Sequence, residues 1–195
     1  GTPDIVVANA GIVLEADLTA TTLEIWERTI AVNLTGIFHT VQAGARMMKS
    51  RRRGAIVLTA STNSYDGEAS LIAYNASKGA VNALTMAIAS QYADKGIRCN
   101  AILPGLMHTP MIDFLAEQYA KGENDHNQAY DKMIAIRNRA SPTGKMGTGW
   151  DTANAALFLA SDEAAYVNGH LLASPSARDS HFIKENQIIR SGTLR

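Results

Sequence analysis

The sequence predicts an α/β fold in which helices cover both faces of a parallel sheet. Three short apolar runs, Ile5–Ala8, Ala55–Ala60 and Ile97–Leu103, have the length and continuity of buried strands. Longer segments with apolar residues at helical spacing separate them, and such alternation is typical of right-handed parallel βαβ units. The first run is as apolar as the others, so we expect a fully buried central strand rather than an edge strand.

Two long helices are expected between these strands. The segment Leu18–Lys49 carries apolar side chains at helical spacing and is interpreted as one helix, bent near Gly36. A polar loop, Ser61–Ser70, follows the second strand. A second helix is then predicted from about Tyr74 to Asp94, and Lys95-Gly96 supplies its stop signal.

The pattern becomes looser after the third strand, from Leu106 to Met146. A helix is expected near Met111–Lys121, followed by the polar stretch Gly122–Gln128 and by another helical piece that ends at Arg139. An insertion of this kind usually covers a site.

A further helix is predicted from Trp150 to Ala160, and Tyr166–Leu172 is a candidate last strand. The remaining Ala173–Arg195 has no clear period. We therefore expect one domain over residues 1–172 and a divergent tail over residues 173–195.

Composition narrows the class of protein. The chain has 195 residues, of which 46% are hydrophobic and 18% charged, which suits one domain with a buried core. Eighteen basic residues balance eighteen acidic ones, so no global charge favours nucleic acid or a membrane, and the run Lys49–Arg53 is attributed to a helix end. A single cysteine, Cys99, and five histidines without zinc-ligand spacing predict no disulfide, no metal and a reducing, cytoplasmic location.

Three polar residues suggest acid/base chemistry. Tyr74 and Lys78 lie four residues apart at a helix start, which places both on one face. A phenol has a pKa of about 10, and a neighbouring cation favours the phenolate. Ser61 comes at the carboxyl end of a buried strand, where ligands bind in open α/β sheets. Ser64 is the competing hydroxyl, but the spacing to Tyr74 favours Ser61.

Five ordered signals together resemble the short-chain dehydrogenase/reductase family over about Thr2 to Leu172. They are Asn9-Ala10-Gly11, Asn33 within Ala31–Gly36, Ser61, Tyr74-Asn75-Ala76-Ser77-Lys78, and the strand end Asn100–Gly105. The resemblance implies a Rossmann-like, doubly wound parallel sheet in three layers that lacks the first βαβαβ segment. It also implies hydride transfer between NAD or NADP and an alcohol or ketone.

The same resemblance implies a role for each catalytic residue. Tyr74 would be the general acid/base, and Lys78 would hold the nicotinamide ribose and lower the phenol pKa. Ser61 would hydrogen-bond the substrate oxygen, and Asn33 would bind a water that links Lys78 to solvent. Alternatively, Asn33 only satisfies backbone groups at a helix bend.

The cofactor would lie along two segments. Its implied contacts besides Tyr74 and Lys78 are Asn9, Ala10 and Gly11 at the adenosine half, and Pro104, Gly105, Met107 and Thr109 at the nicotinamide end. Thr109 could instead cap the helix that follows it.

The sequence departs from the family pattern at both ends. It lacks the turn T-G-x-x-x-G-x-G that holds the pyrophosphate and the segment that chooses NAD or NADP, and it lacks V-D-G-G after Leu172. We therefore expect an amino-terminally truncated oxidoreductase that acts on a small alcohol or carbonyl compound. The alternative is a non-catalytic α/β module that acts through subunit association. The long helices resemble those with which family members form homodimers or homotetramers.

Overall fold

The computed structural model describes residues 1–121 and 125–174, so most of the expected tail at 173–195 lies outside the described residues. Internal contacts divide the described chain into two units. The first contains residues 1–104 and 152–174, and the second contains residues 105–151.

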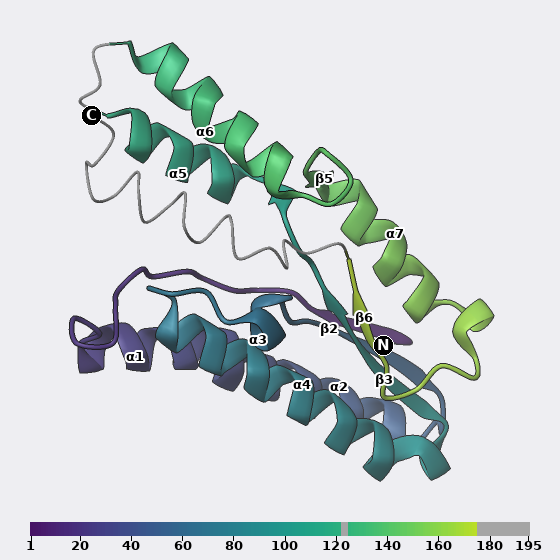
Figure 1. Cartoon of the computed structure of the whole chain (residues 1–195). Helices are drawn as coiled ribbons and strands as arrows, with labels where there is room; N and C mark the ends of the chain where they lie inside the picture. Colours follow the sequence, from purple (N-terminus) through teal and green to yellow (C-terminus); the bar gives the residue numbers. More distant parts are fainter. Residues whose placement is uncertain (122–124, 175–195) are drawn as a thin grey trace. The chain divides into compact units, whose positions relative to one another are not determined.

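The first unit is built on a parallel sheet of four strands in the order β1-β2-β3-β6 (Figure 1). Their bounds are β1 Ile5–Ala8, β2 Gly54–Thr59, β3 Ile97–Leu103 and β6 Leu171–Ala173. All three neighbouring pairs are parallel, which confirms the fold class and the three predicted strands.

The last strand is shorter than the sequence predicts. Only Leu171–Ala173 pairs with β3, whereas the preceding residues form a loop. The loop is fixed by the side chain of Asn168, which accepts a hydrogen bond from the Cys99 amide at 2.9 Å. At Gly169, φ is 75°, a left-handed backbone conformation that an extended strand does not adopt.

The prediction of a fully buried first strand is wrong for the described structure. Among the described residues β1 pairs with β2 only, and the side chains of Ile5 and Val7 are 49% and 48% exposed. Val6, on the opposite face, packs on the core under α2. An apolar run shows that a strand can be buried, but it does not show how many neighbours the strand has.

A continuous helical rod joins β1 to β2. It consists of α1 (Leu23–Ile30), the π-helical turn η1 (Ala31–Gly36) and α2 (Ile37–Lys49). The rod begins later than Leu18, because the Thr22 side chain caps it by accepting from the Ile25 amide at 3.2 Å. The predicted irregularity near Gly36 is this π turn.

The second crossover contains a short helix, α3 (Asn63–Asp66), and the long helix α4 (Ile72–Tyr92). A single 3-10 turn, η2 (Ala93–Lys95), ends at Gly96, where φ is 66°. The stop signal read from the sequence is therefore confirmed.

Helices cover both faces of the sheet in the first unit (Figure 1). On one face α2 and α4 pack against Ile56, Leu58, Cys99 and Ala101 of the central strands. On the other face Val57 and Ile102 pack against Leu159 of α7 (Gly149–Ala160). Alternate residues of β2 and β3 thus face two separate cores, and the expected three layers are confirmed.

The second unit holds a helical hairpin and a small sheet. Its helices are α5 (Pro110–Ala120) and α6 (His126–Ala140), and β4 (Met107–His108) pairs in parallel with β5 (Gly147–Thr148). Both predicted helical pieces are confirmed, although residues 122–124 of the polar stretch lie outside the described residues. In the described part of the chain, no helix is long and apolar enough to cross a membrane.

Gly44 allows α2 to approach β1 closely. A Cβ atom at this position would lie 2.6 Å from Cγ2 of Val6. We expect Gly44→Ala to lower the free energy of unfolding by about 1–3 kcal/mol, because Val6 is stiff and must shift. Urea unfolding measures this loss.

Gly79→Ala in α4 is the matched control, since its Cβ would meet nothing within 4 Å. It is expected to raise stability by roughly 0.5–1 kcal/mol. In the Gly44→Ala background, Val6→Ala should cost less than it does alone. Additive losses would contradict the proposed close contact.

Candidate active site

Several of the predicted site residues gather in the first unit where β1, β2 and β3 end. Asn9 follows β1, Ser61 follows β2 and Pro104 follows β3, while Tyr74 and Lys78 lie in the first turns of α4. The carboxyl ends of parallel strands form the ligand-binding crevice of open α/β sheets.

Tyr74 and Lys78 lie on one face of α4, as their spacing predicts. Lys78 Nζ is 5.7 Å from the centre of the Tyr74 ring. The Lys78 side chain is only 3% exposed, and Nζ donates a hydrogen bond to the Thr59 carbonyl oxygen at 2.7 Å. The end of β2 therefore fixes the ammonium beside the phenol.

The structure separates the two candidate serines. The Ser61 hydroxyl lies close enough to the Tyr74 phenol to lower its pKa, and Ser61 Oγ accepts from the Asn63 amide at 3.2 Å. Ser64 instead donates from its hydroxyl to the Ser61 carbonyl oxygen at 2.5 Å. These contacts favour Ser61 as the partner of Tyr74.

The pKa of Tyr74 is raised above its ordinary value of 10, chiefly by burial. The hydrogen bond from Ser61 lowers this pKa, and the charge of Glu68 raises it. Burial also lowers the pKa of Lys78 from 10.5 to about 8. Burial is therefore the dominant influence on both groups, and the expectation that Lys78 lowers the phenol pKa stays a prediction.

Asn33 lies in the π turn η1 and is fully buried. Its amide nitrogen donates to the Ile12 carbonyl at 2.9 Å and to Ser77 Oγ at 3.1 Å, and its Oδ1 accepts from the Ile12 amide at 2.8 Å. Asn33 thus satisfies backbone groups, as the alternative interpretation expects. The water relay implied by the resemblance stays a prediction, and it would use the remaining lone pair of Oδ1.

Gly11 brings the backbone close to this pair of polar groups. A Cβ atom at Gly11 would lie 3.5 Å from both Asn33 Oδ1 and Lys78 Nζ. Asn9, two residues earlier, accepts from the Thr59 hydroxyl at 2.9 Å. The hydroxyl groups of a cofactor ribose can both donate and accept hydrogen bonds. The Lys78 ammonium, the Tyr74 phenol and the Asn33 amide oxygen, which lie beside the backbone segment ending at Gly11, suit them. The residues present therefore fit the nicotinamide half of NAD or NADP.

The other implied cofactor residues are placed as follows. The Pro104 carbonyl accepts from the Thr62 amide at 3.1 Å, which ties the end of β3 to the loop after β2. Gly105, Met107 and Thr109 belong to the second unit. Thr109 occupies the N-cap position of α5, but within the described chain its side chain makes no capping hydrogen bond. The cofactor roles of all these residues stay predictions.

Sequence reasoning missed Ser77, which lies between Tyr74 and Lys78. Its hydroxyl donates to the Tyr74 carbonyl oxygen at 2.7 Å, and its Oγ accepts from Asn33. Ser77 is fully buried and thereby joins η1 to α4. A serine on the buried face of an apolar helix was the available signal.

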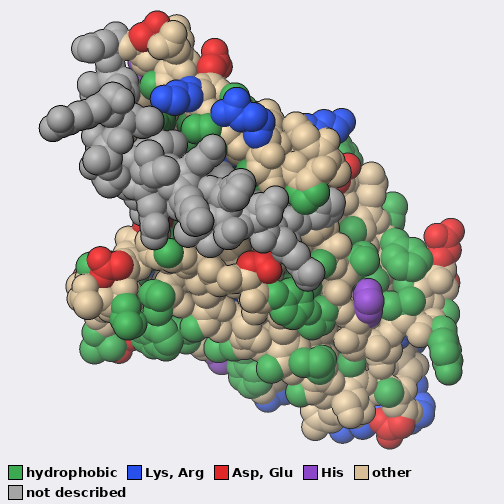
Figure 2. Space-filling view, in the orientation of Figure 1, with side chains coloured by type: hydrophobic (Ala, Val, Ile, Leu, Met, Phe, Trp, Pro, Cys, Tyr) green, Lys and Arg blue, Asp and Glu red, His purple; other side chains and the backbone are tan. Residues whose placement is uncertain are grey.

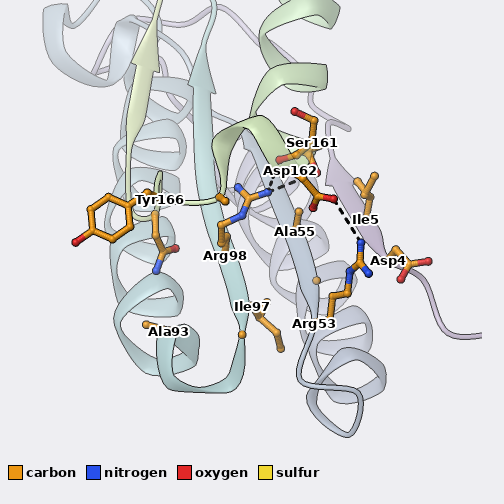
Figure 3. A pocket seen from close by; sticks show the side chains of 15 residues that line it. Asp4, Ile5, Arg53, Ala55, Ala93, Ile97, Arg98, Ser161, Asp162 and Tyr166 are labelled. Atoms are coloured by element: carbon orange, nitrogen blue, oxygen red, sulfur yellow. Dashed lines mark hydrogen bonds and ion pairs between the residues drawn. The ribbon is translucent and has the colours of Figure 1, made fainter.

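A separate cavity of about 820 Å³ lies at the opposite, amino-terminal ends of the strands (Figure 3). Arg98 on its wall donates to the carbonyl oxygens of Leu159 and Ser161 at the end of α7, at 2.7 and 2.9 Å. Arg53 pairs with Asp162 at 3.6 Å. The Arg98 guanidinium thus satisfies carbonyl oxygens at the carboxyl end of α7. The cavity is remote from the polar cluster at the carboxyl ends of the strands.

The buried Lys78 gives stability a specific pH dependence. Its pKa is about 8 in the folded chain and about 10.5 when exposed, so the unfolded chain binds the extra proton between these values. Stability relative to Lys78→Met should therefore rise with pH from 8 to 10.5, by on the order of 3 kcal/mol in total. Urea unfolding at several pH values measures this difference.

The exposed Lys132, changed to Met in the same way, is the control. If the Lys78→Met and Lys132→Met proteins show the same dependence of stability on pH, the Lys78 ammonium is not desolvated in the folded chain.

Comparison with known proteins identifies the family. The sequence model of the family described as "Enoyl-(Acyl carrier protein) reductase" matches residues 1–174. The chain is 37% identical over 180 residues to a 3alpha-hydroxysteroid dehydrogenase of Mediterraneibacter gnavus, covering 92% of this chain and 66% of that relative.

Solved structures agree with this match. A putative 2-deoxy-d-gluconate 3-dehydrogenase from Agrobacterium tumefaciens with bound NADP is 34% identical, with a TM-score of 0.77, and the alignment covers 90% of this chain and 67% of that one. A NAD+-bound xylitol dehydrogenase is 30% identical with the same TM-score, over 89% of this chain and 68% of that one. This chain spans about two thirds of the length of the relatives that it matches. It belongs to the short-chain dehydrogenase/reductase family.

Proposed function

We propose that the protein carrying this chain is an oxidoreductase that transfers a hydride between NAD or NADP and an alcohol or ketone. The observation that carries this proposal is the buried Lys78 ammonium, held by the Thr59 carbonyl beside the Tyr74 ring at the strand end that Ser61 follows. Relatives named as dehydrogenases support it. NAD or NADP, when bound, supplies the hydride donor or acceptor.

Tyr74 would carry the proton of the reaction. Its raised pKa keeps the phenol protonated at neutral pH, which suits protonation of a carbonyl oxygen during reduction. Oxidation of an alcohol needs the phenolate, so alkaline pH would favour that direction. Ser61 would hold the substrate oxygen at the Tyr74 hydroxyl, and Lys78 Nζ would hold the hydroxyls of the ribose.

We assign the remaining contacts as the resemblance implies. Asn33 would hold a water next to Lys78, and the two lie together beside Gly11. The other proposed cofactor contacts are Asn9, Ala10 and Gly11 at the adenosine half, and Pro104, Gly105, Met107 and Thr109 at the nicotinamide end. The substrate would be a small alcohol or carbonyl compound, and the protein would act in the cytoplasm.

We also propose that the protein is a homodimer or homotetramer. Large apolar side chains of α1, α2 and α4 are exposed, among them Leu23, Trp26, Phe38, Met47 and Met86. Figure 2 shows apolar side chains, in green, at the surface in the region where Figure 1 places these helices. Helix faces of this kind are favourable surfaces for a second copy of the chain.

A non-catalytic module that acts only through subunit association is the second candidate. The exposed apolar side chains of α1, α2 and α4 are the observation that favours it. Titration with NAD(H) and NADP(H) separates the two candidates, because a Kd below about 1 mM would contradict the non-catalytic one.

Tyr74→Phe tests the catalytic proposal in the full protein. The change removes the transferable proton but keeps the ring, so kcat over a panel of alcohols and ketones should fall at least about 100-fold. Cofactor affinity, measured by nucleotide fluorescence, should change little. Tyr65→Phe, at an exposed tyrosine, is the control. Unchanged kcat for Tyr74→Phe would exclude the proposed acid/base role.

Trp26→Glu and Phe38→Glu test the oligomer proposal. A carboxylate in a buried helix interface costs several kcal/mol, so the association constant should fall at least about tenfold in analytical ultracentrifugation. Phe114→Glu, at an exposed position of the second unit, serves as the control. The proposal fails if both helix variants keep the association state of the unchanged protein.

A further inference from the structure

Asn82 continues the face of α4 that carries the catalytic pair. Tyr74, Lys78 and Asn82 are spaced by four residues each, and the Asn82 side chain is only 7% exposed. The proposed acid/base mechanism gives Asn82 no role.

Two hydrogen bonds connect Asn82 to Ser61. Asn82 Nδ2 donates to Ser64 Oγ at 2.7 Å, and the Ser64 hydroxyl donates to the Ser61 carbonyl oxygen at 2.5 Å. The α4 helix therefore reaches the backbone of Ser61, the residue whose hydroxyl lowers the Tyr74 pKa.

The loop after β2 is fixed from two sides at its beginning. On the strand side, the Thr62 amide donates to the Pro104 carbonyl at 3.1 Å. On the helix side, Ser64 takes the hydrogen bond from Asn82. The residues that follow, 65 to 69, are exposed, so packing beyond Ser64 adds little to the position of Ser61.

Stability alone does not favour an asparagine at position 82. In the described part of the chain, Asn82 Oδ1 is buried without a hydrogen-bond partner. A buried, unpaired carbonyl oxygen costs about 1–3 kcal/mol, which an apolar side chain would avoid. The hydrogen bond that Asn82 Nδ2 donates to Ser64 must therefore have a role that offsets this cost.

We propose that Asn82 is a positioning residue that acts through Ser64 to hold Ser61 against Tyr74. One face of α4 then carries Tyr74 and Lys78 and also positions Ser61 next to them. The effect on catalysis rests on the proposed function. The position of Ser61 relative to Tyr74 does not depend on it and can be tested separately.

The first readout is the phenol pKa of Tyr74 in the full protein without cofactor. It is measured by NMR titration with ¹³Cζ-labelled tyrosine, and Tyr74→Phe assigns the signal. The hydrogen bond from Ser61 lowers this pKa, so Ser61→Ala should raise it. Asn82→Leu and Ser64→Ala should each raise it in the same direction, and the double variant should raise it no further.

The second readout is steady-state kinetics over pH. Asn82→Leu should lower kcat roughly fivefold to tenfold, the equivalent of one hydrogen bond, with the KM for cofactor within about twofold. The pH profile of alcohol oxidation should move to more alkaline pH. Ser64→Thr keeps the hydroxyl, so its kcat and its pH profile should match those of the unchanged protein.

Thr85→Val is the matched control. Thr85 is a fully buried polar residue of the same helix whose hydroxyl donates to the Val81 carbonyl at 2.8 Å. Its replacement should leave the Tyr74 pKa and the pH profile unchanged.

A purely structural Asn82 would overturn the proposal. In that case Asn82→Leu would change urea stability while the Tyr74 pKa and the pH profile stay in place, or the effects of Asn82→Leu and Ser64→Ala would add. Should Asn82→Leu fail to fold, Ser64→Ala alone decides the question by the same readouts. Loss of the proposed function itself would appear separately, as unchanged kcat in Tyr74→Phe.

Discussion

The burial of the Lys78 ammonium is the constraint on which the rest of the site depends. A desolvated cation is costly unless it is hydrogen-bonded, and here the Thr59 carbonyl at the end of β2 accepts from Nζ. This contact requires the first turns of α4 to lie directly over the carboxyl end of the sheet. The same requirement brings Tyr74 to Ser61, because both residues flank that strand end.

The π turn in the helix after β1 completes this arrangement. It places Asn33 in the interior, where the amide bonds both backbone groups of Ile12 and the hydroxyl of Ser77. Three segments are thereby joined: the loop after β1, the helical rod and α4. A π turn is less stable than a regular helix and is common at functional sites, so these hydrogen bonds explain how it persists here.

The fold and the central pair of the site could be read from the sequence because both depend on local pattern. Continuous apolar runs gave the strands, and the four-residue spacing placed Tyr74 and Lys78 on one face. The exposure of Ile5 and Val7 on β1 and the contacts of Ser64 could not be read, because they depend on segments that are distant in the chain. The rise of the Tyr74 pKa by burial could not be read either, since burial is a property of the packed structure.

The sequence by itself determined the parallel α/β architecture, the order of its elements and the residue types of the site. Tertiary structure alone buried the Lys78 ammonium and gave Asn33, Ser77 and Asn82 their partners. The physical reason is that hydrogen bonds between α4 and the loops after β1 and β2 join residues far apart in sequence. Their geometry exists only once the sheet and its covering helices have packed.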